Sequence, residues 1–367
     1  MSPIDTGNQY YLNRSKGIRR RVSVMRNISY ARALLILRFC FVNDFVIVFR
    51  LYTCMKNILV TGAFGQIGSE LVPALQKRFG EHHVVALGHS TIPDNFNGIV
   101  EKAEITDGKV LEKVITKYRI DTVYHLVSLL SAKGEIDPTL TWNVNMNGLK
   151  LILDLAVSKQ LRVFWPSSIA AFGPTTPRVM TPQRTVLEPA TMYGVTKVSG
   201  ELLVQYYHKK YNLDVRSVRY PGLISWKTPP GGGTTDFAVA IFYEGLQKGS
   251  YECFVRPDTM LPMMYMDDAI RGTMELMDSD GTKLTIRTSY NLGAISFTAR
   301  ELAQEINKHI KVSVTYKPDH RQKIADSWPE SIDDTVARHD WGWKHEYTLP
   351  KMTTVMIKEL KKKFGMK

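Results

Sequence analysis

The chain has 367 residues, of which 44% are hydrophobic and 23% are charged, so it can bury one large core or two smaller ones. Its formal net charge is +13, but the first 54 residues hold nine Lys and Arg against two Asp, and the remainder carries only +6. This distribution argues against a nucleic-acid partner, because the excess charge belongs to the leader and the remainder has no basic run longer than Lys361-Lys362-Lys363. The three cysteines have neither pairing nor metal-ligand spacing, which favours free thiols, a reducing compartment and no bound metal.

Residues 1–54 form a segment of distinct composition. Residues 10–38 are rich in Arg and nearly free of acids, as transit peptides are. The apolar part that follows is interrupted by charges, so it lacks the roughly 18 apolar residues of a membrane span, and we expect no stable membrane insertion. We expect a mitochondrial targeting segment and localisation in the matrix. A non-native upstream extension ahead of Met55 or Met25, which would leave a cytoplasmic protein, and a membrane anchor are the alternatives.

From Met55 onward, strands alternate with helices, which predicts an α/β fold with a Rossmann-type, doubly wound parallel sheet. The expected strands are 57–61, 83–87, 121–127, 162–166, 214–219 and 288–292. The expected helices are 67–79, 108–118, 139–159, 194–211, 236–248, 263–278 and 348–363, with helices or loops at 295–308 and 323–342. We assign 55–224 with 262–294 to a dinucleotide-binding domain, 225–261 with 295–350 to a smaller substrate-binding lobe, and 351–367 to a C-terminal helix.

The stretch from Lys56 to Ser69 predicts a strand, a glycine turn and a helix. Gly62, Gly65 and Gly68 follow the strand at three-residue intervals. This arrangement lays a dinucleotide pyrophosphate on backbone N–H groups at a helix N-terminus. Gly62 permits the turn, Gly65 lets the backbone approach the phosphates, and Gly68 lets the helix pack on the strand. Gln66 and Ile67, between these glycines, complete the expected cradle.

Further cofactor contacts are expected where the next strands end. The second strand ends at Gly88, with neither the acid that selects NAD nor an Arg that accommodates a 2′-phosphate, and on balance we expect NAD. Glu104 and Ile105 are candidate adenine contacts; a helix N-cap at the next two residues, Thr106 or Asp107, is the alternative, and both can hold. Leu126 and Val127, at the end of strand 121–127, complete the set.

Three residues form the candidate catalytic group. Tyr193 and Lys197 are four residues apart in a predicted helix and therefore share one face. A phenol is a poor base at neutral pH, and a neighbouring ammonium lowers its pKa, so the pair suits proton transfer from an alcohol. Ser168 follows strand 162–166 and could hold a substrate oxygen beside the tyrosine, although such a serine is often a simple cap.

The three glycines, then Ser168, then Tyr193 with Lys197, occur in the order and spacing of the extended short-chain dehydrogenase/reductase superfamily, which the chain therefore resembles. Asn145, ahead of a helix, also fits this pattern. Over roughly 55–365 the chain is similar to L-threonine 3-dehydrogenases of the short-chain type. The segments that carry this similarity are WPSSIAAFGP at 165–174, GGGTTDFAV at 231–239, PMMYMDDAIR at 262–271, YNLGAISFT at 290–298 and IADSWPESIDDTVARHDWGWKHEY at 324–347. Two positions depart from the family pattern, namely Gly88, where Asp is usual, and Phe64, where smaller residues are common.

The resemblance implies NAD-dependent oxidation of the 3-hydroxyl of L-threonine to 2-amino-3-oxobutyrate, without zinc. It also implies a functional link to 2-amino-3-oxobutyrate CoA ligase, which leads to glycine and acetyl-CoA, and a homodimer. Tyr193 would be the general base, Lys197 would assist it and bind the nicotinamide ribose, and Ser168 would hold the substrate oxygen. The implied substrate contacts also include Thr235 for the carboxylate, Ser131 for the polar end and Trp328 as a cover. Thr235 could instead cap a helix, and Trp328 could simply pack the lobe.

Two rival functions remain open from the sequence. A nucleotide-sugar epimerase or dehydratase often has Asn after an Arg-Tyr pair like Arg219-Tyr220, whereas Pro221-Gly222 follows here, and no Arg-rich diphosphate clamp stands out. A non-catalytic dinucleotide-binding module would have lost the serine, the tyrosine or the lysine, and all three are present.

Overall fold

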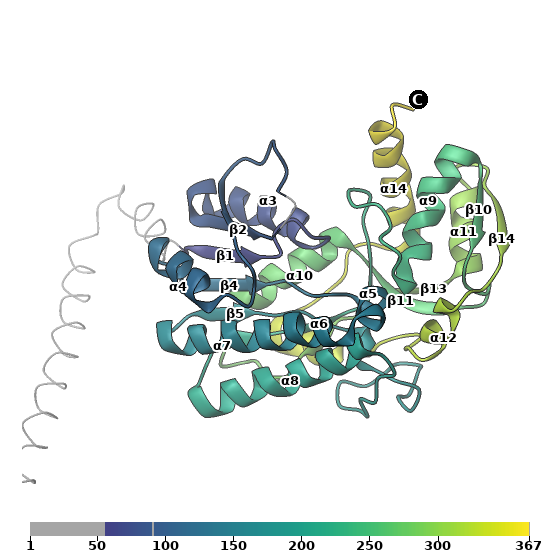
Figure 1. Cartoon of the computed structure of the whole chain (residues 1–367). Coiled ribbons are helices and arrows are strands. Elements are labelled where there is room, and N and C mark those ends of the chain that lie inside the picture. The colour runs from purple at the N-terminus through teal and green to yellow at the C-terminus, as the bar shows by residue number, and fades with distance from the viewer. Residues whose placement is uncertain (1–55, 90–91, 367) are drawn as a thin grey trace, which may run out of the picture. The chain divides into compact units, whose positions relative to one another are not determined.

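The computed structural model describes residues 56–89 and 92–366 (Figure 1), so the expected leader 1–54 lies outside the described residues. A six-stranded parallel sheet in the order β3-β2-β1-β4-β5-β7 organises the fold. Its strands are β1 (Ile58–Thr61), β2 (Val84–Gly88), β3 (Ile99–Lys102), β4 (Thr122–His125), β5 (Arg162–Phe164) and β7 (Val215–Arg216). This is the strand order of a doubly wound dinucleotide-binding sheet, which confirms the predicted fold class.

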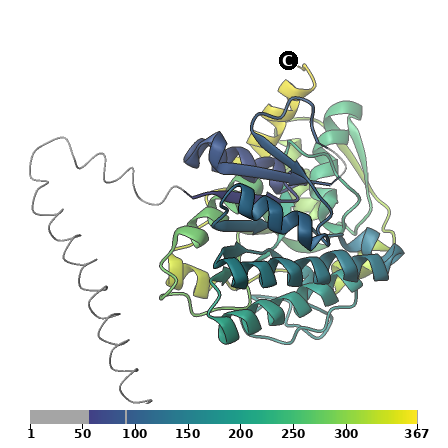
Figure 2. The ribbon, with the colours of Figure 1, turned by 60° about the vertical axis from the view of Figure 1, so that its left-hand side comes forward.

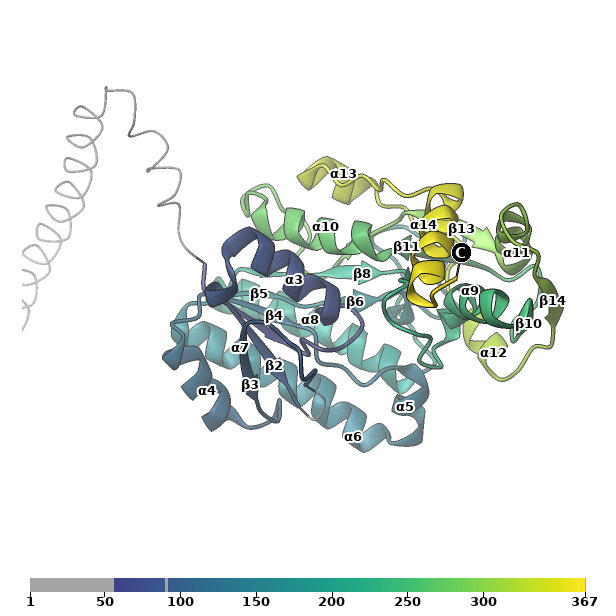
Figure 3. The same ribbon diagram turned by 90° about the horizontal axis from the view of Figure 1, so that it is seen from above.

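Helices cover both faces of this sheet, as Figures 1 and 3 show. One face carries α3 (Gly68–Phe79), α10 (Met266–Asp278) and α13 (Thr335–Trp341), and the other carries α4 (Gly108–Lys117), α7 (Gly148–Lys159) and α8 (Met192–Tyr211). Strands β1 and β2 are buried along their whole length, which is why they read as continuous apolar runs, whereas the edge strand β3 is half-buried. Ile58 and Val60 pack into one core, whereas Leu59 between them packs into the other.

A second group of elements shares its own hydrophobic core and lies beside the sheet, on the right in Figure 1 and seen from another side in Figure 2. Its helices are α9 (Phe237–Lys248), α11 (Ala299–Asn307), α12 (Arg321–Asp326) and α14 (Leu349–Lys363). Its strands are β9 (Gly222–Ile224), β10 (Ser250–Cys253), β11 (Met260–Tyr265), β13 (Ile295–Thr298) and β14 (Ser313–Tyr316). The assignment of this group as a substrate-binding lobe stays a prediction. Within the described residues, no helix is long and apolar enough to cross a membrane.

Several predicted boundaries are wrong for an identifiable reason. The helix expected at 263–278 starts at Met266, because 263–265 belong to β11, which pairs with β9 and β13. The strand expected at 214–219 is interrupted at Ser217; β7 joins the large sheet, and β8 (Val218–Tyr220) pairs with β6 (Ser167–Ser168) and β12 (Tyr290–Asn291). The helix expected at 139–159 consists of α6 (Pro138–Trp142), a π-helical turn at Asn143–Asn147 and α7.

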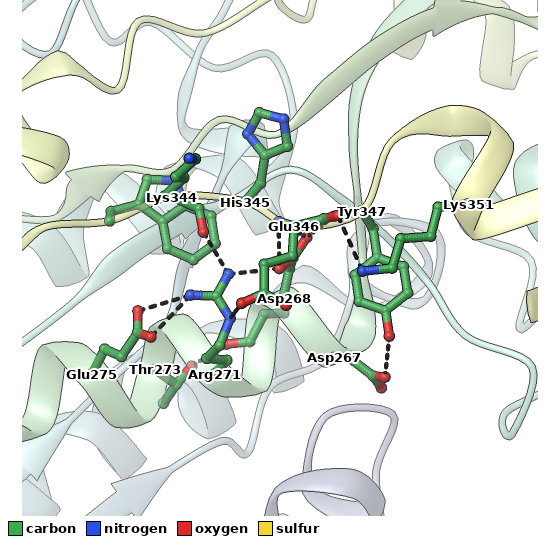
Figure 4. A network of polar contacts seen from close by, with 12 residues as sticks. Asp267, Asp268, Arg271, Thr273, Glu275, Lys344, His345, Glu346, Tyr347 and Lys351 are labelled. Atoms are coloured by element: carbon green, nitrogen blue, oxygen red, sulfur yellow. Dashed lines mark hydrogen bonds and ion pairs between the residues drawn. The ribbon is translucent and has the colours of Figure 1, made fainter.

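The segment between α13 and α14 is fastened to α10 by one buried carboxylate (Figure 4). Asp268 accepts the backbone N–H of Glu346 at 2.9 and 3.0 Å and that of Tyr347 at 3.0 Å, and it pairs with Arg271 at 2.7 Å. Tyr347 also donates its hydroxyl to Asp267 at 2.9 Å. These bonds give the backbone N–H groups of Glu346 and Tyr347 their acceptors. They fix the path of the chain from α13 to α14, which packs on α9.

Candidate active site

The glycine turn after β1 has the close approaches that the sequence predicts. Gly62 has φ of +68°, and a β-carbon there would lie 3.0 Å from backbone atoms of Leu126 and Val127. A β-carbon on Gly68 would lie 2.3 Å from the Gly62 carbonyl oxygen, so only glycine lets α3 start this close to the strand. The N-terminal N–H groups of α3 have no side-chain cap. This cradle fits the pyrophosphate of a dinucleotide.

The other predicted cofactor residues differ in position. Glu104 is exposed and pairs with His89 just beyond β2, whereas Ile105 is buried against Gly148 at the start of α7. Asp107 caps α4 by accepting from the Val110 N–H at 3.1 Å, so the expected helix cap is present. Asn145 lies in the π-helical turn, where its amide bonds both backbone groups of Leu129, at 2.8 and 3.1 Å. Asn145 therefore holds the backbone of the segment that follows β4 in place.

A cavity of about 150 Å³ at the carboxyl end of the sheet brings together residues that lie far apart in the sequence. The predicted residues that line it are Gln66, Ile67, Leu126, Ser131, Ser168, Tyr193, Lys197, Thr235 and Trp328. Those outside its lining are Gly62, Gly65, Gly68, Glu104, Ile105, Val127 and Asn145. All the predicted catalytic and substrate residues thus share one cavity. Ligands of open α/β sheets bind at this edge.

Ser168 and Tyr193 lie close together because the turn that follows Ser168 packs against the first turn of α8. Thr191 caps α8 by accepting from the Gly194 N–H at 3.1 Å, which puts Tyr193 in the first turn. A β-carbon on Gly194 would lie 2.3 Å from the Ala170 carbonyl oxygen, so this glycine allows α8 to touch the turn after Ser168. The Ser168 hydroxyl also accepts from the Ala170 N–H at 3.2 Å, so the residue is both a cap and a cavity residue.

The pKa of Tyr193 beside Lys197 differs from the prediction. Burial raises the pKa of Tyr193 to about 12, and a hydrogen bond from Ser168, not the charge of Lys197, is the interaction that opposes it. Lys197 Nζ lies 5.3 Å from the centre of the tyrosine ring and donates to the Pro166 carbonyl at 2.8 Å. Burial lowers the pKa of Lys197 to about 7, opposed by Glu201. The expected lowering of the tyrosine pKa is therefore wrong for this structure, because desolvation of the phenolate outweighs the stabilisation it receives.

A buried ion pair holds the strand end against α8. Glu201, one turn beyond Lys197, accepts from the Ser167 hydroxyl at 2.6 Å and from Arg219 on β8 at 2.8 and 2.6 Å. Pro166, Ser167 and Ser168 thus contribute, in turn, a carbonyl to the lysine, a hydroxyl to Glu201 and the hydroxyl beside the tyrosine. We call Ser167, Glu201 and Arg219 the brace.

The remaining wall of the cavity comes from the second group of elements. Thr235 lies in a short 3₁₀ turn, Thr234–Asp236, ahead of α9, and its methyl group packs over Gly222. Its side chain is not the cap of α9. Trp328 is buried in the core of this group, as the packing interpretation expects, and it also lines the cavity. The Trp328 carbonyl accepts from Arg178 at 3.2 Å.

Ser128 is a lining residue that the sequence analysis missed. It follows β4, and its hydroxyl oxygen is buried without a hydrogen-bond partner among the described residues. Because a buried hydroxyl is normally paired, this one suits a bound ligand. The only local signal was its position directly after strand 121–127. No cluster of three or more His, Cys, Asp or Glu suited to a metal ion occurs within 56–89 and 92–366.

Comparisons with known proteins place this geometry in a family. Residues 58–293 match the model of the NAD dependent epimerase/dehydratase family. L-threonine 3-dehydrogenase, mitochondrial, of Bos taurus is 47% identical over 306 residues, which cover 82% of each chain.

Two solved structures are similar over more than four fifths of this chain. A monomeric L-threonine 3-dehydrogenase from a metagenome, in its apo form, is 50% identical with a TM-score of 0.81 and covers 83% of this chain and 99% of its own. The GalE-like L-threonine dehydrogenase of Cupriavidus necator, in its holo form, is also 50% identical, has a TM-score of 0.81, and covers 83% of this chain and all of its own. The chain therefore belongs to the NAD dependent epimerase/dehydratase family.

Proposed function

We propose that this protein is an NAD-dependent oxidoreductase that converts the 3-hydroxyl of L-threonine to the ketone of L-2-amino-3-oxobutyrate. The observation that carries this proposal is the convergence of Ser168, Tyr193 and Lys197 in one cavity beside the glycine cradle. The names of relatives that are 47–50% identical over more than four fifths of the chain support the choice of substrate.

Each residue of the trio has a role that follows from its surroundings. Tyr193 would take the proton of the substrate hydroxyl, and Ser168 would donate a hydrogen bond to the same oxygen. Lys197, fixed by the Pro166 carbonyl, would stabilise negative charge on the tyrosine oxygen and hydrogen-bond the nicotinamide ribose. NAD, when bound, supplies the acceptor for the hydride that leaves the third carbon. Because burial favours the neutral phenol, only the deprotonated fraction of Tyr193 would accept this proton.

The rest of the chain would bind the two ligands. Gly62, Gly65 and Gly68 with Gln66 and Ile67 would cradle the pyrophosphate. The other proposed cofactor residues are Glu104, Ile105, Leu126, Val127 and Asn145. On the substrate side, Thr235 would receive the carboxylate, Ser131 would bind the polar end, and Trp328 would cover it; each of these lines the cavity. The Rossmann domain of 55–224 with 262–294, the substrate lobe of 225–261 with 295–350 and the helix 351–367 would then have separate roles.

The test is formation of NADH by the purified full-length chain. L-threonine would be compared with L-serine and D-threonine, with NAD and with NADP, beside a Tyr193→Phe control that keeps the shape of the site. We expect NADH formation that requires L-threonine and NAD and is lost in the control. A protein that binds NAD but oxidises no threonine would contradict the proposal and favour a nucleotide sugar as substrate.

We also propose a homodimer, formed through the outer faces of the helical region 138–159 and of α8. Leu140, Trp142, Leu202, Tyr206 and Tyr211 there are 43–59% exposed, although they are apolar or aromatic. The monomeric relative from a metagenome argues the other way, so solution mass has to decide. We further propose that residues 1–54 direct the protein to mitochondria, as the name of the mitochondrial bovine relative suggests. The product would there pass to 2-amino-3-oxobutyrate CoA ligase.

A further inference from the structure

A second cavity, of about 230 Å³, lies behind the brace and shares no lining residue with the catalytic cavity. Its wall is built by the loop after β6, by α8, by β8 and by the segment between α10 and β12; Figure 3 labels α8, β8 and α10. Three arginines line it, namely Arg184, Arg219 and Arg287, and no acidic residue does. Because the charged residues of the lining are all cations, the cavity favours a negatively charged occupant.

The ion pairs around this cavity leave positive charge uncompensated. Arg219 is neutralised by Glu201 within the brace. Asp214 serves three guanidinium groups, because it bonds Arg216 at 2.9 and 3.0 Å, Arg162 at 2.8 Å and Arg287 only at 3.6 Å. The exposed Asp280 is a further acid near Arg216, and it bonds Thr282. Burial, with the charge of Arg216 adding to it, lowers the pKa of Arg287, as expected for a cation that lacks a full partner.

Several hydrogen-bond donors of the lining are free. The Nη1 of Arg287 is buried and has no hydrogen-bond acceptor among the described residues, although Nη2 donates to the Gly281 carbonyl. Among the described residues, Arg184 makes no hydrogen bond or ion pair. The hydroxyls of Thr185 and Thr288 likewise have no hydrogen-bond partner there. The Thr285 hydroxyl, in contrast, already donates to Asp340 at 2.6 Å. Two guanidinium groups and two hydroxyls therefore converge with unused donors.

From this geometry we propose that the cavity is a binding site for a phosphate group, held by Arg184, Arg287, Thr185 and Thr288. Guanidinium groups bind phosphate through paired, charge-assisted hydrogen bonds, and hydroxyls complete the coordination of its oxygens. The unused donors suffice for the oxygens of one phosphoryl group, so the occupant is inorganic phosphate or the phosphoryl end of a small metabolite. The site is distinct from the glycine cradle and from the cavity that holds Tyr193.

The test uses the full-length protein saturated with NAD, so that the glycine cradle cannot take the probe. Inorganic phosphate and glycerol phosphate would be titrated by calorimetry at a chloride concentration that keeps ionic strength fixed. Arg184→Gln is the main variant, because this exposed side chain bonds nothing in the described structure and its loss should not disturb folding. Lys283→Gln is the matched control, since it removes an exposed cation from the segment that carries Arg287 without touching the lining. Arg287→Gln is the second variant.

We expect phosphate to bind saturably to the wild type. Binding should weaken about tenfold or more in Arg184→Gln and in Arg287→Gln, because each variant loses one charge-assisted hydrogen bond. Binding should be unchanged in Lys283→Gln. Tighter binding of glycerol phosphate than of inorganic phosphate would identify a metabolite as the source of the phosphoryl group, and the reverse would identify the free ion. The proposal is overturned if neither probe binds to the NAD-saturated protein, or if both arginine variants bind as the wild type does.

Discussion

The ring of Phe64 lies against Gly88, so that a β-carbon at position 88 would come within 2.8 Å of the ring Cδ2 and 2.9 Å of Cε2. Phe64 belongs to the glycine turn and Gly88 ends β2, and the ring also packs edge-on against Phe96 at 5.2 Å. The two departures from the family pattern, Phe64 and Gly88, are therefore in direct contact and depend on each other. The aromatic ring occupies the space that an acidic side chain at the end of β2 would need.

This relationship makes a prediction about the cofactor. Gly88→Asp alone should weaken NAD binding and lower the melting temperature, because the new side chain collides with Phe64. In the background of Phe64→Ala, the same aspartate should reach the ribose 2′-OH and raise the ratio of NAD to NADP affinity about tenfold or more. Dissociation constants for both cofactors in Phe64→Ala and in the double variant would measure this. An unchanged ratio would show that β2 does not read the ribose here.

The buried phenol predicts a rate that rises with pH. Because burial raises the pKa of Tyr193 to about 12, the fraction of phenolate grows about tenfold for each pH unit below that value. We expect kcat for threonine oxidation to increase with pH up to about pH 7 and less steeply above it, where Lys197 loses the charge that stabilises the phenolate. Tyr193→Phe should lower kcat by about 10² to 10⁴. Ser168→Ala should move the profile to higher pH, since this hydroxyl lowers the pKa of the phenol. A flat profile in the wild type would exclude Tyr193 as the titrating base.

Lys197 should be dispensable for folding although it is needed for activity. Burial holds its pKa at about 7, below that of the unfolded chain, so the unfolded state binds more protons between about pH 7 and 10. The stability of the wild type relative to Lys197→Met should therefore rise with pH across that range. At pH 7 the variant should lose no more than about 1 kcal/mol, because the cost of burying the ammonium is removed together with its bond to Pro166. Urea denaturation at pH 7 and pH 9, beside an activity assay, would measure both effects.

The sequence predicts the parts of this fold that rest on local patterns. The strand, glycine turn and helix at 58–79 are found where they are expected, since the apolar run and the glycine spacing are local signals. Residues 263–265 are misassigned, because Met263, Met264 and Tyr265 continue the apolar pattern of the helix and become a strand only by pairing with β9 and β13. The burial of Ser128 and the high pKa of Tyr193 depend on what the tertiary fold packs around them.

The brace provides a prediction about positioning. Glu201→Gln leaves Arg219 buried without a countercharge, which should lower the free energy of unfolding by about 3 kcal/mol or more. The double variant Glu201→Met/Arg219→Met removes both charges and the acceptor of the Ser167 hydroxyl, and it should recover much of this loss. Because Ser167 then lacks its acceptor, kcat should stay low in the double variant, whereas the KM for threonine should change little. Full recovery of kcat along with stability would show that the brace has a structural role only.

The last prediction concerns the exposed side chains of α8. Leu202 is 59% exposed on the helix that carries Tyr193, and Tyr206 lies one turn further along. If α8 packs across a two-fold axis, Leu202→Glu places like charges opposite each other in an apolar contact and should convert the dimer to a monomer. Met180→Glu is the matched control, because that methionine is 58% exposed but lies in a loop away from α8. Sedimentation velocity would give the mass of each form. A wild type that sediments as a single chain would contradict the dimer and would agree with the monomeric relative from a metagenome.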